Sequence, residues 1–220
     1  MTHGRYRGLI LDFAGVLTDG IREAHDAWCA AEGLPPRAWE RALEQHPEGR
    51  RFYRALEIGE MTQDEWNRRT ARLLGLADHH DLMGRAWRAV RPAIDMRNLA
   101  RAARGAGLRL ALLSNSFGLD PFDPYAHCGV WDLFDVHVIS ETERLAKPDP
   151  EIYRRTLERL ELPAQECLFV DDNPINLPPA RALGITTVHA TTQAETVALL
   201  SEALGAAPSA RAEPPTATSS

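Results

Sequence analysis

The amino-acid sequence predicts an α/β fold, in which a parallel β-sheet has helices on both faces and an all-helical segment is inserted after the first strand. Three features of the 220 residues support this prediction. Short apolar runs recur along the chain, helical patterns separate the later runs, and one long segment lacks any convincing strand. Strands that alternate with helices are typical of parallel sheets covered on both faces.

Five apolar runs predict the strands of this sheet. The first, at 8–11, comes directly before Asp12, and the others lie late in the chain. They cover 108–113, 136–140, 167–170 and 185–190. Each run has the length of a strand that is buried on both faces, as in the interior of a parallel sheet. The long strandless segment therefore separates the first strand from the rest.

Helical patterns lie between the later strands and fill the long segment. Residues 96–106 predict a helix that ends before Gly107, and residues 150–160 predict one that begins with Pro150. The strandless segment, 20–91, contains further helical stretches at 21–31, 37–45 and 62–74. We expect these helices to form a cap that packs on the edge of the sheet as a lid.

This pattern divides the chain into three parts. We expect residues 1–19 and 92–205 to form the catalytic core, residues 20–91 the helical cap, and residues 206–220 a disordered tail rich in Ala, Pro, Ser and Thr. Within the cap, Thr62 and Glu65 have the spacing of a capping box at a helix start. Four of the five tryptophans lie in the cap, where we expect them to form its core.

Composition and charge exclude several classes of function. The formal net charge is −6, which argues against a nucleic-acid-binding protein that works through a basic surface. The three cysteines have no CxxC spacing, fit neither a disulfide framework nor a zinc site, and favour a reducing cytoplasm. No apolar stretch has the length of a membrane span, and Asp12 interrupts the first apolar run. We expect a cytoplasmic monomer or homodimer without a nucleic-acid or membrane partner.

Polar and charged side chains follow several of the predicted strands at or shortly after the point where each strand ends. These residues are Asp12, Ser114, Asn115, Lys147, Asp171 and Asp172. Ligands of parallel sheets bind beyond the carboxyl ends of the strands, so we expect these groups to converge. Clustered carboxylates repel one another unless a cation lies between them, and oxygen ligands suit Mg²⁺. The sequence therefore predicts a magnesium site that shares its ion with a substrate phosphate.

Four segments resemble, in order and spacing, the motifs of the haloacid dehalogenase-like (HAD) hydrolase superfamily. They are "LDFAGVLTD", "LLSNS", "AKPDPEIY" and "FVDDNPINLPPARALG", and the resemblance extends from about residue 6 to about residue 205. The inserted segment, with "GEMTQDEW", resembles the helical cap of the branch that holds the phosphatase domain of bifunctional epoxide hydrolases. The resemblance implies a Rossmann-like core, a mobile cap, Mg²⁺ and a phosphoaspartyl intermediate.

The resemblance also implies which residues carry the phosphoryl group and the metal. Asp12 would be the nucleophile that attacks phosphorus, which splits one difficult step into two easier ones. The magnesium ion would be held by Asp12, by the main-chain carbonyl of Ala14 and by Asp172. Asp171 would either bind the ion or lie directly behind its ligands.

Further residues match motif positions that bind phosphate or support the site. Ser114 and Asn115 would donate hydrogen bonds to the phosphoryl oxygens. Lys147 would neutralise the charge shared by Asp12 and the phosphate, which is an electrostatic and positioning role. Asn176 would steady Lys147 or the metal ligands.

The use of lysine supports the role of Lys147 independently of the resemblance. Of the 25 basic residues, 24 are arginine, and only Lys147 is lysine. A chain that uses arginine wherever either base will do keeps lysine where a compact ammonium is needed. The cap therefore contains no lysine, which excludes the Schiff-base chemistry of the phosphonoacetaldehyde hydrolases that share the pattern of residues 12–15.

One position departs from the pattern of the phosphatases that the chain resembles. Most of them carry a second aspartate two residues after the nucleophile, as acid for the leaving group and base for water, but here that residue is Ala14. Acid–base catalysis contributes about 10²–10⁴-fold, so its loss would slow hydrolysis of a plain alkyl phosphate. Three outcomes stay open: a leaving group that needs little protonation, a proton supplied by another acid such as Asp19, Asp120 or Glu23, or ligand binding without turnover.

From these observations we expect a Mg²⁺-dependent hydrolase, a phosphatase of a small phosphorylated metabolite that forms an aspartyl phosphate on Asp12. The alternative is a catalytically impaired relative that binds a phosphorylated ligand or regulates another process. A haloacid dehalogenase is less favoured, because its aspartate attacks carbon without a metal and the Asp171-Asp172 pair would have no role. His25 is a weaker acid–base candidate.

Overall fold

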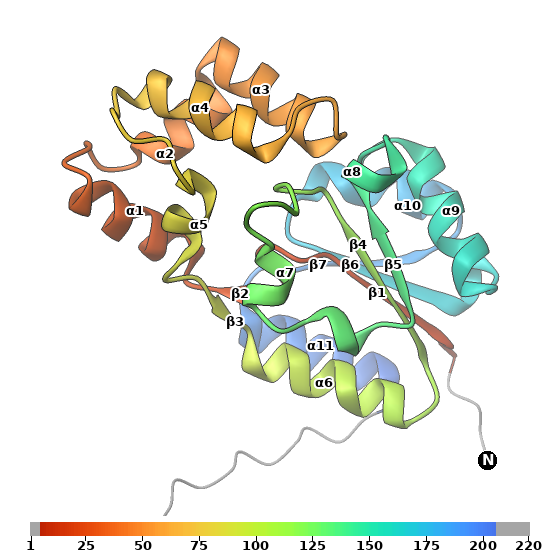
Figure 1. The fold of residues 1–220 in the computed structure, drawn as a ribbon. Helices are drawn as coiled ribbons and strands as arrows, with labels where there is room; N and C mark the ends of the chain where they lie inside the picture. Colours follow the sequence, from red (N-terminus) through yellow and green to blue (C-terminus); the bar gives the residue numbers. More distant parts are fainter. Residues whose placement is uncertain (1–4, 206–220) are drawn as a thin grey trace, which may run out of the picture.

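A computed structural model of the protein describes residues 5–205, so the expected tail at 206–220 lies outside the described residues. Its main sheet has five strands in the order β5-β4-β1-β6-β7, and all neighbouring pairs are parallel (Figure 1). The strands are β1 (Gly8–Leu11), β4 (Arg109–Ser114), β5 (Val136–Ile139), β6 (Cys167–Asp171) and β7 (Thr186–His189). The α/β fold with a parallel sheet and a helical insertion is confirmed.

Helices cover both faces of this sheet because side chains of a strand alternate between the two faces. Leu9 and Leu11 pack with α6 (Ile94–Gly105) and α11 (Gln193–Leu204) on one face. Ile10, between them, packs with α9 (Pro150–Leu160) and α10 (Leu177–Ala182) on the other. The first strand is therefore apolar on both sides, which explains its uninterrupted run of apolar residues.

The helical insertion leaves the sheet after β1 and returns to it before β4. Its helices are α1 (Ile21–Ala31), α2 (Ala38–Glu40), the π-helical turn η1 (Arg41–Gln45), α3 (Pro47–Glu57), α4 (Gln63–Leu74) and α5 (Leu82–Trp87), which we call the cap helices. The connection runs through two short antiparallel strands, β2 (Thr18–Asp19) and β3 (Arg91–Pro92). Thr62 accepts a hydrogen bond from the main-chain N of Glu65 at 3.3 Å, so α4 begins as the capping pattern predicts.

The remaining elements are short and lie in the loops of the core. They are α7 (Pro124–His127), η2 (Trp131–Leu133), α8 (Ser140–Glu143), η3 (Ala164–Glu166) and η4 (Pro174–Asn176). All three cysteines are buried as free thiols. None of the helices in the described part of the chain combines the length and the apolarity needed to cross a membrane.

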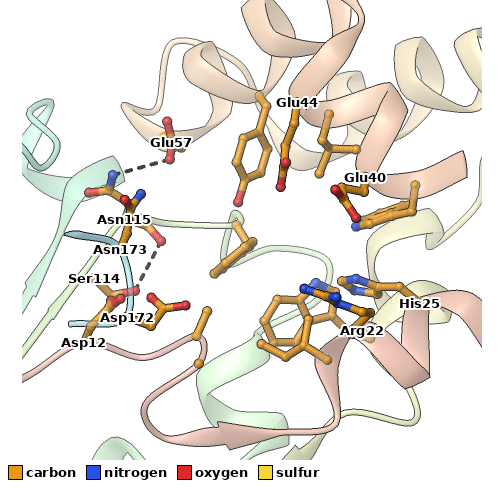
Figure 2. Close-up of a pocket in the computed structure, with 18 of the residues that line it drawn as sticks. Asp12, Arg22, His25, Glu40, Glu44, Glu57, Ser114, Asn115, Asp172 and Asn173 are labelled. Carbon is orange, nitrogen blue, oxygen red and sulfur yellow. Dashed lines mark hydrogen bonds between the residues drawn. The ribbon is translucent and has the colours of Figure 1, made fainter. Parts of the chain in front are cut away.

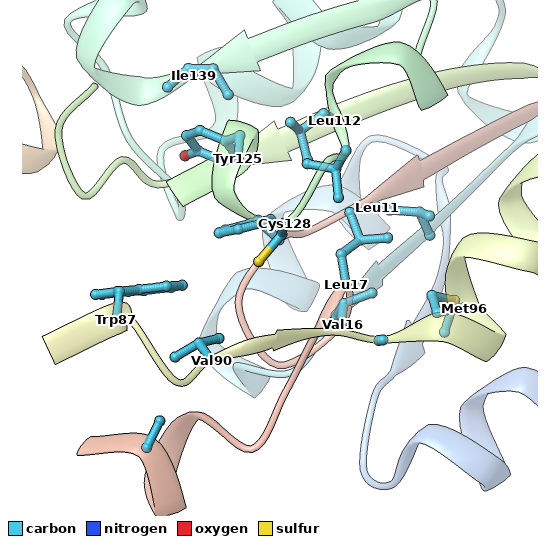
Figure 3. Packing of buried hydrophobic residues seen from close by; sticks show 14 of the residues in the cluster. Leu11, Val16, Leu17, Trp87, Val90, Met96, Leu112, Tyr125, Cys128 and Ile139 are labelled. Carbon is cyan, nitrogen blue, oxygen red and sulfur yellow. The ribbon is translucent and has the colours of Figure 1, made fainter. Parts of the chain in front are cut away.

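Aromatic rings pack the cap helices onto the core. Trp87 of α5 stacks on Phe13, which follows β1, with ring centroids 5.8 Å apart, and it contacts Phe117 at 4.7 Å. Figure 3 shows Trp87 beside Val90 at the margin of the buried cluster that contains Leu11 and Leu17. The four tryptophans expected in the cap are all buried, so the cap and the core share one apolar interior.

Hydrogen bonds between the α3–α4 turn and two core loops add to this packing. The buried side chain of Gln63 donates to the main-chain oxygens of Phe117 and Phe122 at 2.9 and 3.0 Å. It also accepts from the main-chain N of Phe122 at 2.9 Å. On the other side of the turn, Ser140 donates to the main-chain oxygen of Glu57. These contacts hold the end of α3 directly above the carboxyl ends of the strands.

Candidate active site

Three of the polar residues identified from the sequence lie side by side because their strands are neighbours in the sheet. Ser114 ends β4, Asp12 follows β1 and Asp171 ends β6, in the sheet order β4-β1-β6. The main-chain N of Asp12 donates to the carbonyl of Val170 at 2.9 Å, which extends the pairing of β1 with β6 by one residue. All three side chains are buried at the carboxyl edge of the sheet.

Lys147 joins this group from the loop after α8. Its Nζ atom lies 2.7 Å from Oδ1 of Asp12 and 2.6 Å from Oδ2 of Asp171. The loop is held by Asn115, whose side chain accepts from the main-chain N of Lys147 at 2.9 Å and donates to its main-chain oxygen at 3.1 Å. The single lysine of the chain is thus fixed between two carboxylates.

Burial and charge together shift the pKa values of this group. Burial raises the pKa of Asp12 to about 7, since the opposing charge of Lys147 only partly offsets desolvation and the nearby Asp171 adds repulsion. Burial works against the charged form of Lys147, but Asp12 and Asp171 outweigh it and raise the pKa of the ammonium. Burial and Asp171 also raise the pKa of Asp172. Three carboxyl groups thus surround one ammonium, and Lys147 alone does not fully offset the cost of charging Asp12 and Asp172.

The two oxygens of Asp171 are already bound by protein donors. Asn176 donates to both of them at 3.0 Å, and the main-chain N of Asn173 donates to Oδ1 at 2.8 Å. Tyr153 in turn donates to the main-chain oxygen of Asn176 at 2.7 Å. Asp171 thus accepts hydrogen bonds through both carboxylate oxygens. Asp172 is the more exposed residue of the two, and among the described residues it takes no part in an ion pair.

The residues present fit a divalent cation. Asp12, Asp171 and Asp172 each offer an oxygen, and these oxygens lie within 4.8 Å of one another. Gly15 has a φ of +75°, and a Cβ atom built there would lie 2.3 Å from Oδ2 of Asp172. The glycine therefore leaves the space that the Asp172 carboxylate occupies. An all-oxygen set of this kind is the chemistry that Mg²⁺ prefers.

Ser114 and Asn115, the pair expected to bind phosphate, also lie at the site, but both side chains already form hydrogen bonds within the protein. Tyr125 donates to Oγ of Ser114 at 3.0 Å, and Ser114 donates to the main-chain oxygen of Asn115 at 3.2 Å. The Asn115 side chain holds the Lys147 loop, as described above, so its main-chain N is the group that we expect to donate to a ligand. Ser114 and the Asn115 main chain then face the same space as Asp12 (Figure 2).

A cavity of about 570 Å³ opens above these groups, between the sheet edge and the cap helices (Figure 2). Its floor contains Asp12, Ser114, Lys147 and Asp172, and Ala14 lines it beside the nucleophile position. Aromatic side chains from the cap and the core form much of its wall, namely Trp39, Tyr53, Trp87 and Phe117. Trp39 and Trp87 therefore serve both the buried core and the cavity wall.

Acidic and basic side chains of the cap reach the same cavity. Arg22, His25, Asp26, Arg37, Glu40, Glu44 and Glu57 line it, whereas Asp19, Glu23 and Asp120 do not. The acids that the sequence analysis suggested as replacements for the missing aspartate thus lie away from the site. Glu57 and Tyr53 were missed, because no local pattern tells which end of a cap helix will lie over the core.

Comparison with known proteins agrees with this geometry. The family described as haloacid dehalogenase-like hydrolase matches residues 6–184. A sesquiterpene phosphatase of Aspergillus oryzae is 32% identical over 116 residues, which are 53% of this chain and 59% of that protein. The (S)-2-haloacid dehalogenase H-109 of Pseudomonas putida is 26% identical over 188 residues, 80% of this chain and 82% of that one.

The branch suggested by the cap is also present among the relatives. Bifunctional epoxide hydrolase 2 of Rattus norvegicus is 31% identical over 98 residues, 42% of this chain and 18% of that protein. A HAD-family enzyme of Bacteroides thetaiotaomicron, solved as a magnesium complex, superposes with a TM-score of 0.65 at 24% identity. The match covers 84% of this chain and 93% of that one, and it shows the shared fold.

Proposed function

The chain belongs to the haloacid dehalogenase-like hydrolases, and from this premise we propose that it is a Mg²⁺-dependent phosphatase of a small phosphomonoester. The observation that carries the proposal is the group formed by Asp12, Lys147 and the two acidic residues of β6 and its following loop. The Lys147 ammonium and the carboxylates of Asp12 and Asp172 lie on the floor of a cavity large enough for a small metabolite, and the buried Asp171 carboxylate contacts Lys147 beside them. The magnesium complex of the B. thetaiotaomicron enzyme and the phosphatase named among the relatives support the choice of metal and reaction.

The metal would be held by Asp12, Asp172 and the main-chain carbonyl of Ala14. When bound, Mg²⁺ supplies positive charge that offsets the carboxylates and favours the developing charge on phosphorus oxygens. Asp171 would contribute charge and orient Lys147, because its own oxygens already accept from Asn176 and from the main chain.

In the first chemical step, an oxygen of Asp12 attacks phosphorus and the bond to the leaving oxygen breaks. Lys147 lowers the repulsion between the Asp12 carboxylate and the anionic phosphate, because its ammonium contacts that carboxylate directly. The Ser114 hydroxyl and the Asn115 main-chain N–H would donate hydrogen bonds to the phosphoryl oxygens. Water then hydrolyses the aspartyl phosphate and releases inorganic phosphate.

Dehalogenation is the second candidate, since a dehalogenase is among the relatives that match most of their length. The charges of the site disfavour it. A 2-haloacid is itself an anion, and it would meet Asp171 and Asp172 next to the nucleophile without a metal to balance them. Binding of a phosphorylated ligand without turnover is the third candidate, because Ala14 lacks a group that transfers protons.

One experiment separates these candidates. The purified protein is assayed for phosphate release on a panel of phosphomonoesters with Mg²⁺ and with excess chelator, and for halide release from 2-haloacids. We expect phosphate release that requires Mg²⁺ and disappears in Asp12→Asn. Halide release without metal would replace the proposal by dehalogenation. Saturable binding of phosphomonoesters without turnover would indicate the non-catalytic relative.

A further inference from the structure

Ala14 leaves the proposed reaction without its usual proton donor, so the question is which side chain of the cavity can supply a proton. The leaving oxygen departs on the side of phosphorus opposite to Asp12. That side faces the cap helices, because Asp12 lies on the floor of the cavity. A replacement donor is therefore expected on the cap and not in the core.

Among the cap acids that line the cavity, Glu57 is the one that contacts Asn115, a residue expected to bind the phosphoryl group. It is the last residue of α3, and its Oε1 atom lies 3.4 Å from Nδ2 of Asn115. Asn115 also holds the main chain of Lys147. In Figure 2, Glu57 points from the cap toward Asn115, with Asp12 and Ser114 below it.

Glu57 is held in place by the cap–core contacts described above. Its main-chain oxygen accepts a hydrogen bond from Ser140, and its side chain is only 14% exposed. Arg54, one turn earlier on the same helix, approaches the second carboxylate oxygen at 3.6 Å. The carboxyl group thus has a defined position above the floor, and its contacts with Asn115 and Arg54 are long, which leaves it able to turn to a ligand.

We propose that the Glu57 carboxyl group replaces the missing aspartate and donates the proton to the leaving oxygen of the substrate. This proposal rests on the phosphatase function proposed above. As the bond between phosphorus and the ester oxygen breaks, that oxygen takes the proton of Glu57 and leaves as a neutral alcohol. Glu57, now a carboxylate, regains a proton from the water whose oxygen attacks the aspartyl phosphate. Asp12 is returned as a carboxylate, and the cycle closes without another reactant.

The surroundings of Glu57 suit a group that changes between acid and base. Burial raises its pKa above the ordinary range of a glutamate, against the lowering effects of Arg54, Asn115 and Lys147. Tyr53, on the same helix, also lies close enough to interact with its charge. A raised pKa brings the acid form nearer to neutral pH, where proton donation is most efficient.

The test compares two kinds of substrate in the Glu57→Gln variant. Glutamine keeps the size of the side chain and an oxygen that accepts from Asn115, but it has no acidic proton. We expect kcat/KM for an alkyl phosphate to fall by about 10²–10⁴-fold, because an alkoxide is a poor leaving group without protonation. For p-nitrophenyl phosphate, whose leaving group needs little protonation, the loss should be less than about tenfold. Retained activity on this ester also shows that the variant is folded.

Two glutamates serve as matched variants. Glu44→Gln changes another acid of the same cavity, on η1, and Glu48→Gln changes an acid of α3 that does not line the cavity. Neither should lose alkyl phosphate hydrolysis selectively. An equal loss of activity on both substrates in Glu57→Gln would overturn the proposal. A selective loss of alkyl phosphate hydrolysis in Glu44→Gln would also overturn it, as would a wild-type protein that hydrolyses only the aryl ester. Failure of the phosphatase function itself is recognised separately, as the absence of any Asp12-dependent phosphate release.

Discussion

The Nζ atom of Lys147 lies 2.7 Å from Oδ1 of Asp12, and both side chains are buried. Replacing Lys147 by Met removes the positive charge that compensates the buried carboxylates of Asp12 and Asp171. We expect the free energy of unfolding to fall by about 3–5 kcal/mol, because the remaining buried carboxylates lose their partner. Urea unfolding of the metal-free protein measures this.

A double-mutant cycle tests the pairing itself. Adding Asp12→Asn to Lys147→Met removes one of the unbalanced charges, so the double variant should be more stable than the sum of the single effects predicts. Strictly additive effects would contradict a direct interaction between the two side chains.

Gly15 provides a second test, directed at the metal site. A methyl group at this position would collide with the Asp172 carboxylate, so Gly15→Ala should raise the Mg²⁺ concentration needed for activity by about tenfold or more and lower the thermal midpoint. Gly75 is a matched control, because its φ of +72° is similar but nothing lies within 4 Å of an added Cβ. Gly75→Ala should cost only about 1 kcal/mol of stability and leave the Mg²⁺ requirement unchanged. Equal effects on Mg²⁺ dependence in both variants would contradict a specific role of Gly15 at the metal site.

Most of the floor of the site could be predicted from the sequence because, apart from Lys147, its residues lie at or next to strand ends. Asp12, Ser114 and Asp171 follow apolar runs, and parallel strands bring their carboxyl ends to one edge. The resemblance implied a supporting role for Asn176, but its donation to both oxygens of Asp171 and the bonds of Asn115 to the Lys147 loop could not be predicted in detail. They depend on side-chain directions in loops, which the pattern of apolar residues does not encode.

The positions of the cap residues that lie over the cavity could be predicted less well from the sequence. Residues 37–45 read as one helix, but the chain turns from α2 into the π-helical turn η1 before α3 begins at Pro47. The position of Glu57 over Asn115 depends on how α3 docks on Ser140 and on how Gln63 binds the 117–122 loop. These contacts join residues more than fifty positions apart, so no short motif announces them. The proposed domain limits at 19/20 and 91/92 stay predictions.

His25 leads to a prediction about pH and stability. Its ring packs on Trp39 with centroids 5.2 Å apart, and among the described residues its buried Nε2 atom has no hydrogen-bond partner. Burial lowers the pKa of His25 from 6.5 to about 4, with a smaller opposing effect from Asp26. Between these two values the unfolded chain binds a proton that the folded protein does not, so stability is full above pH 6.5 and falls as the pH drops toward 4.

We therefore expect the wild-type protein to lose about 1–2 kcal/mol more stability than His25→Gln when the pH is lowered from 7 to 5. Unfolding by urea at the two pH values measures the difference. His80→Gln, at an exposed position, is the control and should follow the wild type. The same pH dependence in all three proteins would show that His25 is not the group responsible.

Ala14 can be used to restore the proton donor that Glu57 is proposed to replace. In the Glu57→Gln background, Ala14→Asp places a carboxyl two residues after the nucleophile and on the wall of the same cavity. We expect kcat/KM for an alkyl phosphate to rise by at least about tenfold over Glu57→Gln alone, with a smaller gain in the wild-type background. An equal gain in both backgrounds would indicate that Glu57 and the aspartate introduced at position 14 do not perform the same proton transfer.

Capture of the aspartyl phosphate tests the proposed role of Asp12 as nucleophile most directly. The protein is mixed with substrate and Mg²⁺, quenched in acid and reduced with borohydride, which converts a phosphorylated aspartate into homoserine, and the peptides are then analysed by mass spectrometry. If Asp12 is the nucleophile, homoserine appears at position 12, and it is absent when Mg²⁺ is chelated and in Asp12→Asn. Phosphate release without modification at position 12, or a modified residue that persists in Asp12→Asn, would contradict nucleophilic attack by Asp12.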